Sequence, residues 1–333
     1  MSHASSGQAP DRKKDTADSP VLLTGATGFI GQRLLPRLIQ AGFSVRCLVR
    51  SKSRFEALFP GLAQLEVIQG DVMDPRALDQ ALEGVGSAYY LVHSLGGGPL
   101  RARSFAREDR KAADTFVQKA EAHSVQRIIY LGGLGERGQD LSPHLASRQE
   151  VAAILGSGRP SLTVLRAAVI VGAGGAAFEI IRSLVDRLPV IVGPRWLNTL
   201  CQPIGVDNVI DFLLGCLLKS ETAGREFDIC GPDQVTYRQL MFAYARARGL
   251  IRFIIALPLS STRVPAYWVD LVSCQPHGLV RPLLEGMRNE VVCQEDTLAD
   301  LVQVQLQGLS EAMDKAVSES AAREEPRCAV IDL

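Results

Sequence analysis

Three glycines at intervals of three residues, Gly25, Gly28 and Gly31, could bring the backbone of this chain against phosphate groups. The segment TGATGFIG (24–31) follows a short apolar run and opens an amphipathic one, so it should join a strand to a helix. At such a junction the first glycine permits a tight turn, the second lets backbone approach a pyrophosphate, and the third allows close helix-on-strand packing. The segment therefore predicts a dinucleotide site, made by Gly25, Thr27, Gly28, Phe29, Ile30 and Gly31.

The residues after the next two predicted strands could select the form of the dinucleotide. NAD-binding folds place an acidic residue after the second strand, where it accepts a hydrogen bond from the ribose 2′-hydroxyl. Residues 50–54 of this chain hold three cations and no carboxylate, which favours a 2′-phosphate. We therefore predict NADP(H) rather than NAD(H), bound by Arg50 and Arg54; a basic surface loop that tolerates either nucleotide is the alternative. Asp71 and Val72, after the third strand, are predicted to contact the adenine.

Short apolar runs alternate with helical patterns along the first half of the chain. This alternation is typical of a parallel sheet covered by helices. Ala112, Phe116, Val117 and Ala120 mark the apolar face of one of these helices. The predicted fold class is α/β, a Rossmann-type doubly wound parallel sheet with a small irregular C-terminal subdomain. Its strands are predicted at 21–25, 45–49, 65–70, 88–93, 127–133 and 162–172.

The same patterns divide the chain into four parts. Residues 1–19 are polar and are expected to form a disordered tail, without the hydrophobic segment of a secretion signal. Residues 20–172 should form the dinucleotide-binding Rossmann core. Residues 173–315 should hold its remaining elements and a subdomain for a substrate or a partner, which prolines between 258 and 282 break into short pieces. Residues 316–333 are expected to form a second flexible tail.

The composition excludes several classes of protein. The 36 basic and 36 acidic residues cancel, so no summed positive field would attract nucleic acid. The sequence has no apolar run of the length that a transmembrane helix needs. The apolar stretch 252–272 leaves peripheral membrane contact open, although its prolines favour packing against the domain or a partner.

The seven cysteines are odd in number, scattered and never spaced as C-x-x-C. This usage predicts neither a disulfide framework nor a metal site, and it fits a reducing compartment. We therefore expect a cytoplasmic protein without a bound metal.

At TGATGFIG (24–31) and GDV (70–72), the chain resembles the short-chain dehydrogenase/reductase superfamily, in its extended and atypical branch. The segments LVHSLGGG (91–98), LRAAVIVGAGGAAFE (165–179) and PRW to QPIGVDNV (194–209) are similar to a bacterial group of NAD(P)-binding proteins. That group is related to NmrA-like regulators and to the nucleotide-binding accessory subunit of respiratory complex I. The resemblance covers about residues 20–310, and it implies that the protein binds NAD(P)(H).

Active members of this superfamily use a serine after the fifth strand and a Y-x-x-x-K pair on the next helix. The tyrosine donates a proton, while the lysine lowers its pKa and holds the nicotinamide ribose. In SPHLASRQE (142–150) these two positions are His144 and Arg148, and Gly132-Gly133 stands at the serine position. The resemblance thus implies a degenerate site, in which Arg148 can still bind ribose and His144 could be a general acid. A surface or capping role for His144 is the alternative.

The resemblance places the substrate pocket between Gly172 and Leu200 and in the C-terminal region. Arg195-Trp196 and Tyr267-Trp268 could line it, and few polar residues lie among them, so we expect an apolar ligand such as a quinone or an aromatic ketone. The pair His93-Ser94, after the fourth strand, is a further candidate on the ligand side, with a structural role as its alternative.

Two functions remain open. One is an NADPH-dependent oxidoreductase acting on an apolar carbonyl or quinone. The other is a nucleotide-binding redox sensor or assembly factor without turnover, with a protein as its partner.

Overall fold

The computed structural model describes residues 19–62, 64–92, 102–135, 142–257, 286–294 and 298–322. The expected N-terminal tail, except its last residue, lies outside this part of the chain, as do His93-Ser94 and Tyr267-Trp268. Within the helices, the side chains of residues 102–105 and 143–144 also lie outside it.

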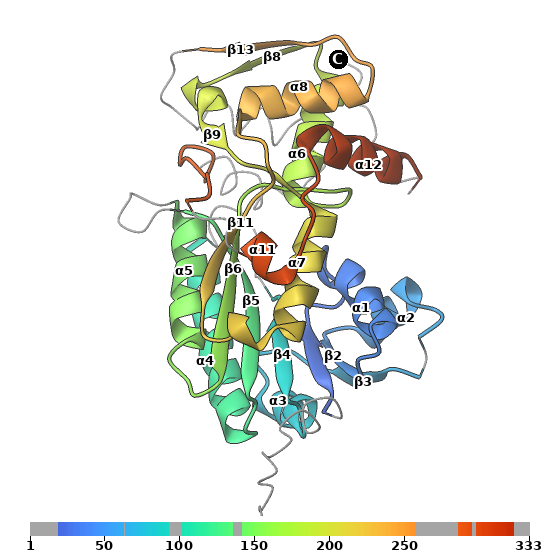
Figure 1. The fold of residues 1–333 in the computed structure, drawn as a ribbon, viewed down its shortest axis with the longest axis vertical. Coiled ribbons are helices and arrows are strands. Elements are labelled where there is room, and N and C mark those ends of the chain that lie inside the picture. Colours follow the sequence, from blue (N-terminus) through green and yellow to red (C-terminus); the bar gives the residue numbers. More distant parts are fainter. Residues whose placement is uncertain are drawn as a thin grey trace, which may run out of the picture.

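A seven-stranded parallel sheet forms the centre of the protein, in the order β11-β6-β5-β4-β1-β2-β3 (Figure 1). The predicted doubly wound Rossmann fold is therefore confirmed. The chain runs outward from β1 to β3 and then returns to β4, so the order reverses between β1 and β4. In open sheets of this kind, ligands bind at the carboxyl ends of the strands beside such a reversal. The strands are β1 (Val21–Thr24), β2 (Val45–Val49), β3 (Glu66–Gln69), β4 (Ser87–Tyr90), β5 (Arg127–Gly133), β6 (Ser161–Ala167) and β11 (Glu226–Ile229).

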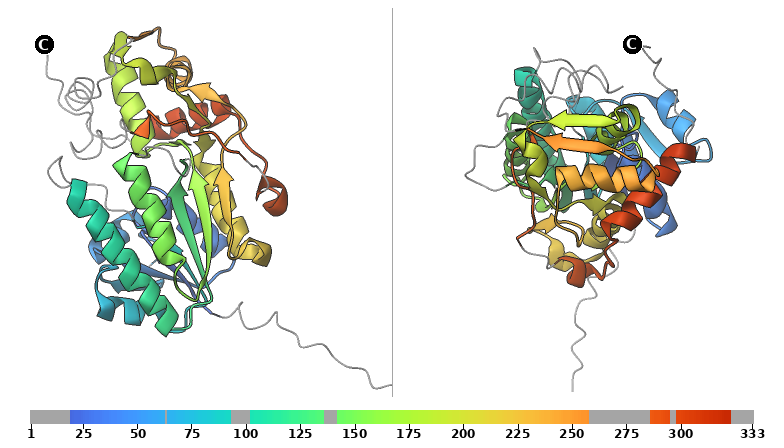
Figure 2. Two further views of the ribbon diagram at one scale, coloured as in Figure 1. Left: turned by 90° about the vertical axis from the view of Figure 1, so that its left-hand side faces the viewer. Right: turned by 90° about the horizontal axis from the view of Figure 1, so that it is seen from above.

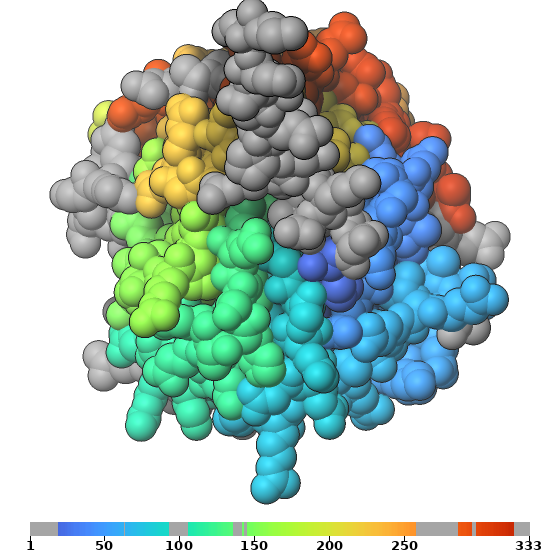
Figure 3. Space-filling model, turned by 60° about the horizontal axis from the view of Figure 1, so that its bottom comes forward, coloured from blue at the N-terminus to red at the C-terminus, as the bar shows by residue number. Residues whose placement is uncertain are grey.

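Helices cover both faces of the sheet, so its central strands are buried on both sides, whereas the edge strand β3 is partly exposed (Figure 2). One layer holds α1 (Gly31–Gln40), α2 (Lys52–Leu58), α7 (Val206–Leu218) and α11 (Leu298–Val302). The other holds α3 (Pro75–Leu82), α4 (Ala102–Ala122) and α5 (Pro143–Leu155). The four residues predicted for the apolar face of α4 are all buried. The end of the molecule away from the C-terminal subdomain consists largely of the first half of the chain, coloured blue to green in Figure 3.

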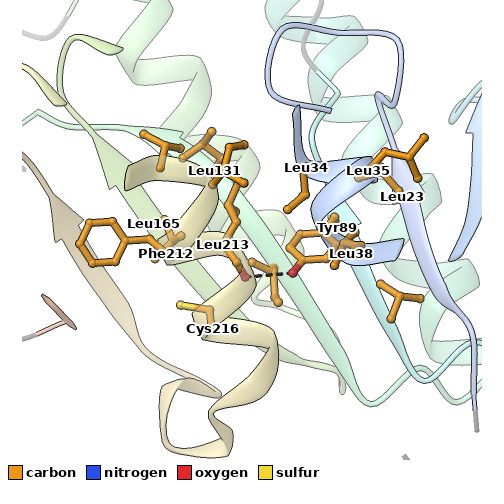
Figure 4. Close-up of a cluster of buried hydrophobic side chains, with 14 of the residues drawn as sticks. Leu23, Leu34, Leu35, Leu38, Tyr89, Leu131, Leu165, Phe212, Leu213 and Cys216 are labelled. Carbon is orange, nitrogen blue, oxygen red and sulfur yellow. Dashed lines mark hydrogen bonds between the residues drawn. The ribbon is translucent and has the colours of Figure 1, made fainter. Parts of the chain in front are cut away.

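Successive residues of one strand belong to different cores. Leu22 packs toward α3 and α4, whereas Leu23 packs toward α1 and α7, because side chains alternate along a strand. Tyr90 and Tyr89 of β4 divide in the same way. The hydroxyl of Tyr89 donates a hydrogen bond of 2.9 Å to the carbonyl of Leu213 in α7, which joins sheet and helix inside the core (Figure 4).

The C-terminal subdomain lies beyond the carboxyl ends of the strands (Figure 1). Its core contains Phe178 and Tyr244, whose rings meet edge to face with centroids 5.6 Å apart. Its helices are α6 (Ala176–Arg187), α8 (Tyr237–Ala247), α12 (Leu309–Ala322) and the 3-10 segment η1 (Arg195–Asn198). A second 3-10 segment, η2 (Ser220–Thr222), follows α7 at the opposite end of the sheet, where Thr222 bonds to Arg127 of β5 and Thr163 of β6. Short strands pair as β7 (Ile170–Val171) with β10 (Ile204–Gly205), β8 (Val190–Gly193) with β13 (Phe253–Ala256), and β9 (Leu200–Cys201) with β12 (Val235–Thr236).

The boundary predicted for the flexible C-terminal tail, at residue 316, is too early. Helix α12 continues to Ala322, and Met313 and Ala316 are buried against the subdomain. The apolar residues of this helix are small and sparse, so its buried face was not visible as a periodic pattern. No helix in the described part of the chain is long and apolar enough to cross a membrane.

The cysteine spacing predicted no disulfide framework, but the structure contains one disulfide. Cys230 and Cys293 are bonded, with their Cα atoms 6.2 Å apart although 63 residues separate them in the sequence. Because this bond is present, the cysteine pattern no longer favours a reducing compartment. Cys47 and Cys201 are buried as free thiols, and burial raises the pKa of each to about 12.

Reduction of this disulfide should destabilise the protein. A cross-link over a loop of this length restricts the unfolded chain and stabilises the folded one by about 2–4 kcal/mol. We expect a lower melting temperature in the presence of a phosphine reductant. The double variant Cys230→Ser, Cys293→Ser is the control, since its melting temperature should not respond to the reductant. An equal response in both proteins would contradict a stabilising bond.

Candidate functional site

The turn after β1 is formed as the glycine spacing predicts. Gly25 has φ of +71°, and a Cβ atom there would lie 2.6 Å from the carbonyl oxygen of Leu91. A Cβ atom on Gly31 would lie 2.2 Å from the carbonyl oxygen of Gly25, so the start of α1 must also lack a side chain. Gly28 closes the turn, with its N–H donating to the Gly25 carbonyl at 2.9 Å, and its own Cβ position faces the outside. A pyrophosphate fits beside Gly28, because no side chain fills this cradle.

Thr24 fixes this turn to the neighbouring strand. Its hydroxyl donates to the carbonyl of Tyr89 at 2.8 Å and accepts from the N–H of Leu91 at 3.1 Å. The side chain is fully buried. The carboxyl ends of β1 and β4 are thereby held together beneath the glycines.

Phe29 and Arg33 attach the same turn to the C-terminal half of the chain. The ring of Phe29 packs on Gly175, where a Cβ atom would lie 2.9 Å from the ring. The guanidinium of Arg33 lies 4.7 Å from the centre of that ring, donates to the carbonyl of Ala173 at 2.7 Å, and pairs with Glu319 of α12 at 3.1 Å. The glycine turn and the subdomain therefore hold each other in place.

A cavity of about 440 Å³ opens at the carboxyl ends of β1, β4 and β5. Its lower wall contains the predicted residues Gly25, Gly28, Phe29, Ile30 and Gly31, together with Arg148. Thr27 does not line it, and its carbonyl accepts from the side chain of Gln32. Its upper wall is formed by apolar residues of the subdomain: Ala176, Ala177, Ile180, Ile181, Leu184, Met241, Met287 and Val291. Among the described residues, Arg148 is the one charged side chain of the lining and Tyr237 the one hydroxyl.

The side chain of Arg148 lies across the end of β5, where the superfamily pattern has its serine. Its guanidinium donates to the carbonyl of Leu131 at 3.2 Å. A Cβ atom on Gly133 would lie 3.1 Å from Cδ of Arg148 and 3.0 Å from Leu145. A side chain at Gly133 would thus make tight contacts with Arg148 and Leu145, and each would have to shift by a few tenths of an ångström to admit a serine.

His144 belongs to the first turn of α5. Ser142 caps this helix by accepting from the N–H of Leu145 at 3.4 Å. Leu145 and Arg148 of the same helix line the cavity, but the His144 side chain lies outside the described part of the chain. Its role as a general acid stays a prediction.

The basic residues after β2 lie in solvent. Ser51 caps α2 by accepting from the N–H of Arg54 at 3.2 Å, and the side chains of Arg50 and Arg54 are exposed. Within the described ranges, neither guanidinium pairs with an acid, so both are available to an anion. Asp71 accepts from the N–H of Met73 at 2.9 Å in the turn after β3. Neither it nor the buried Val72 lines the cavity, so their contact with adenine stays a prediction.

The residues of the upper wall were predicted in part. The segment after Gly172 contributes to the cavity through α6, as expected. Arg195 and Trp196 do not: Arg195 is exposed and Trp196 is buried in the core of the subdomain. Tyr237 and Met241 were missed. The start of α8 is visible in the sequence as a capping signal, but the face that this helix turns to the cavity depends on its packing against α6.

Among the described residues, no cluster of three His, Cys, Asp or Glu side chains could hold a metal ion.

The comparisons with known proteins agree with this geometry. Residues 25–170 match a family described as NAD(P)H-binding. A ceramide reductase from Caulobacter vibrioides is 32% identical over 174 residues, which are 51% of this chain and 52% of that protein. The divinyl chlorophyllide a 8-vinyl-reductase of Zea mays is 26% identical over 69% of this chain and 59% of its own length. The chain thus spans little more than half the length of these curated relatives.

Solved structures share the fold at low sequence identity. An NADPH-dependent quinone oxidoreductase from Escherichia coli, solved with NADPH, has a TM-score of 0.69 and 18% identity, over 88% of this chain and 98% of that one. The UDP-glucose 4-epimerase of Thermotoga maritima also has a TM-score of 0.69, with 16% identity, over 92% of this chain and 100% of that one. At these identities the likeness concerns the fold alone.

Substitution of Gly28 by alanine should weaken dinucleotide binding. The added methyl group would occupy the cradle, whereas its closest contact within the protein, 3.2 Å to the Gly25 carbonyl, is tolerable. We expect the Kd for NADPH in calorimetry to rise at least about tenfold, or about 1.4 kcal/mol. Gly61→Ala is the control, because nothing lies within 4 Å of its added Cβ. Unchanged binding by the Gly28 variant would place the phosphates elsewhere.

Proposed function

We propose that this chain, whose residues 25–170 match an NAD(P)H-binding family, is an NAD(P)H-dependent reductase of the atypical short-chain dehydrogenase/reductase type that acts on an apolar carbonyl compound or quinone. The observation that supports the proposal is the single cavity that joins the glycine turn to the apolar wall of the subdomain. A ligand in the upper half would lie next to a dinucleotide in the lower half.

When bound, the reduced cofactor supplies a hydride, and the acceptor also needs a proton. Arg148 would hold the nicotinamide ribose in place of the lysine of related enzymes, because its donors can bind ribose hydroxyls. The apolar walls would exclude water from the reacting atoms. His144, or a water molecule that it holds, would supply the proton to the acceptor oxygen, since an unperturbed histidine titrates near neutrality.

The relatives favour a reductase. Both curated proteins named above are reductases, and the Escherichia coli neighbour is a quinone oxidoreductase. A second candidate function, assembly or redox sensing without turnover, has support of its own. The photosystem II assembly factor Ycf39 of Cyanophora paradoxa is 23% identical over 72% of both chains. In addition, glycine stands where related enzymes have their catalytic serine, and Arg148 and Leu145 lie close to that position.

The variant His144→Phe separates the two functions. Purified protein is titrated with NADPH and then mixed with a panel of quinones and aromatic ketones, while NADPH absorbance is followed. For a reductase with a histidine acid, we expect wild-type turnover to fall at least about a hundredfold in the variant, with NADPH binding unchanged. Tight binding without oxidation by any acceptor, in either protein, would favour the sensor or assembly factor.

We further propose that NADP(H) is preferred over NAD(H), because Arg50 and Arg54 are exposed cations at the end of β2. The double variant Arg50→Ala, Arg54→Ala should raise the Kd for NADPH at least about tenfold, or about 1.4 kcal/mol, and leave the Kd for NADH unchanged. Arg159→Ala, in the turn between α5 and β6, is a control for the loss of a surface charge. An equal effect on both nucleotides would contradict a 2′-phosphate site.

A further inference from the structure

Tyr237 begins helix α8 at a rigid position. The hydroxyl of Thr236 accepts from the N–H of Gln239 at 3.2 Å, and the side chain of Gln239 accepts from the N–H of Thr236 at 2.7 Å. This capping box fixes the first turn of the helix. The N–H of Tyr237 also donates to the carbonyl of Thr199 at 3.3 Å. These hydrogen bonds fix the backbone at Tyr237, from which its ring extends.

The hydroxyl of Tyr237 makes no hydrogen bond to any described residue. The residue as a whole is only 5% exposed, and it lines the cavity. By contrast, Tyr89, Tyr130 and Tyr244 donate to Leu213, Arg148 and Asp186 respectively. Tyr90 likewise has no partner among the described residues, but it does not line the cavity. Because buried tyrosine hydroxyls usually find a partner, an unpaired one on a cavity wall indicates a ligand.

The surroundings of Tyr237 define the chemistry of that ligand. Met241 lies one helical turn further along α8, and Ile180, Ile181 and Leu184 of α6 also line this part of the cavity. No described side chain of the upper wall carries a charge. A ligand here needs an apolar body, and a single oxygen can pair with the tyrosine.

Tyr237 is a donor of a hydrogen bond rather than an acid. Burial is the main cause that raises the pKa of its hydroxyl far above the ordinary value. The hydroxyl is therefore protonated near neutral pH. It can donate a hydrogen bond to a carbonyl oxygen, and burial makes it a weaker acid than an ordinary tyrosine.

We propose that Tyr237 determines specificity in this cavity, by donating a hydrogen bond to the one carbonyl oxygen of an apolar ligand. That the cavity binds a substrate rests on the proposed function, but the role of Tyr237 concerns binding and does not require turnover. The site would then contain two groups of residues with different roles. Arg148 and the glycine turn would hold the cofactor, and Tyr237 would select the substrate.

A pair of ligands that differ by one oxygen tests this inference. 2-Acetylnaphthalene and 2-ethylnaphthalene have the same ring and nearly the same shape, and only the first accepts a hydrogen bond. Their binding is measured by calorimetry in the presence of oxidised NADP, so that no reduction occurs. We expect the wild-type protein to bind the ketone at least about tenfold more tightly than the hydrocarbon.

The variant Tyr237→Phe should lose this preference while its affinity for the hydrocarbon stays unchanged. Tyr244→Phe is the matched control: it removes a buried hydroxyl from the same helix, outside the cavity, and should keep the preference. A ketone preference that survives in Tyr237→Phe would overturn the inference. So would an equal loss for both ligands, or no preference in the wild-type protein.

The NADPH oxidation assay tests the proposed reductase separately from the binding role of Tyr237. If the ketone preference depends on Tyr237 but no acceptor is reduced, the binding role stands and the reductase is refuted. If acceptors are reduced equally well by Tyr237→Phe, the reductase stands and the role of Tyr237 is refuted.

Discussion

The close approach of two strand ends is the constraint on which the site depends. The backbone after β1 comes so near to the carbonyl of Leu91 after β4 that a side chain on Gly25 would overlap it. Thr24, fully buried, bonds to both sides of this contact. The cavity begins at this position because the chain turns there without any side chain above the strand ends. A larger residue at Gly25 would change the floor of the cavity as well as the turn.

Phe29 and Arg33 connect the glycine turn to the C-terminal subdomain above it. Arg33 bonds to the carbonyl of Ala173 and to Glu319, which belong to segments far apart in the sequence. The glycine turn and the apolar wall of the cavity are therefore positioned by the same contacts. The disulfide at Cys293 and the backbone pairing of Val291 with Leu200 hold a further part of that wall. A cofactor half and a substrate half can align only if these contacts persist.

Helix α5 carries His144 and Arg148 at the two positions where the superfamily that the sequence resembles has its tyrosine and lysine. Arg148 lies close above Gly133, so a serine there would require the arginine to shift by a few tenths of an ångström. The arginine retains donors for ribose hydroxyls. Proton supply and substrate recognition are assigned to other residues. His144 is the proposed source of the proton, and Tyr237 the proposed substrate contact.

The sequence by itself determined the local features of this protein. The glycine turn, the bounds of β2 and β5, and the apolar face of α4 follow from spacing and periodicity over a few residues, so they were predictable. Tertiary structure alone decided which distant residues meet. The pairing of Cys230 with Cys293, the buried face of α12 and the placement of Tyr237 on the cavity wall arise from packing between segments far apart in the chain. Such contacts leave no periodic signal in a single sequence, because each partner is locally an ordinary residue.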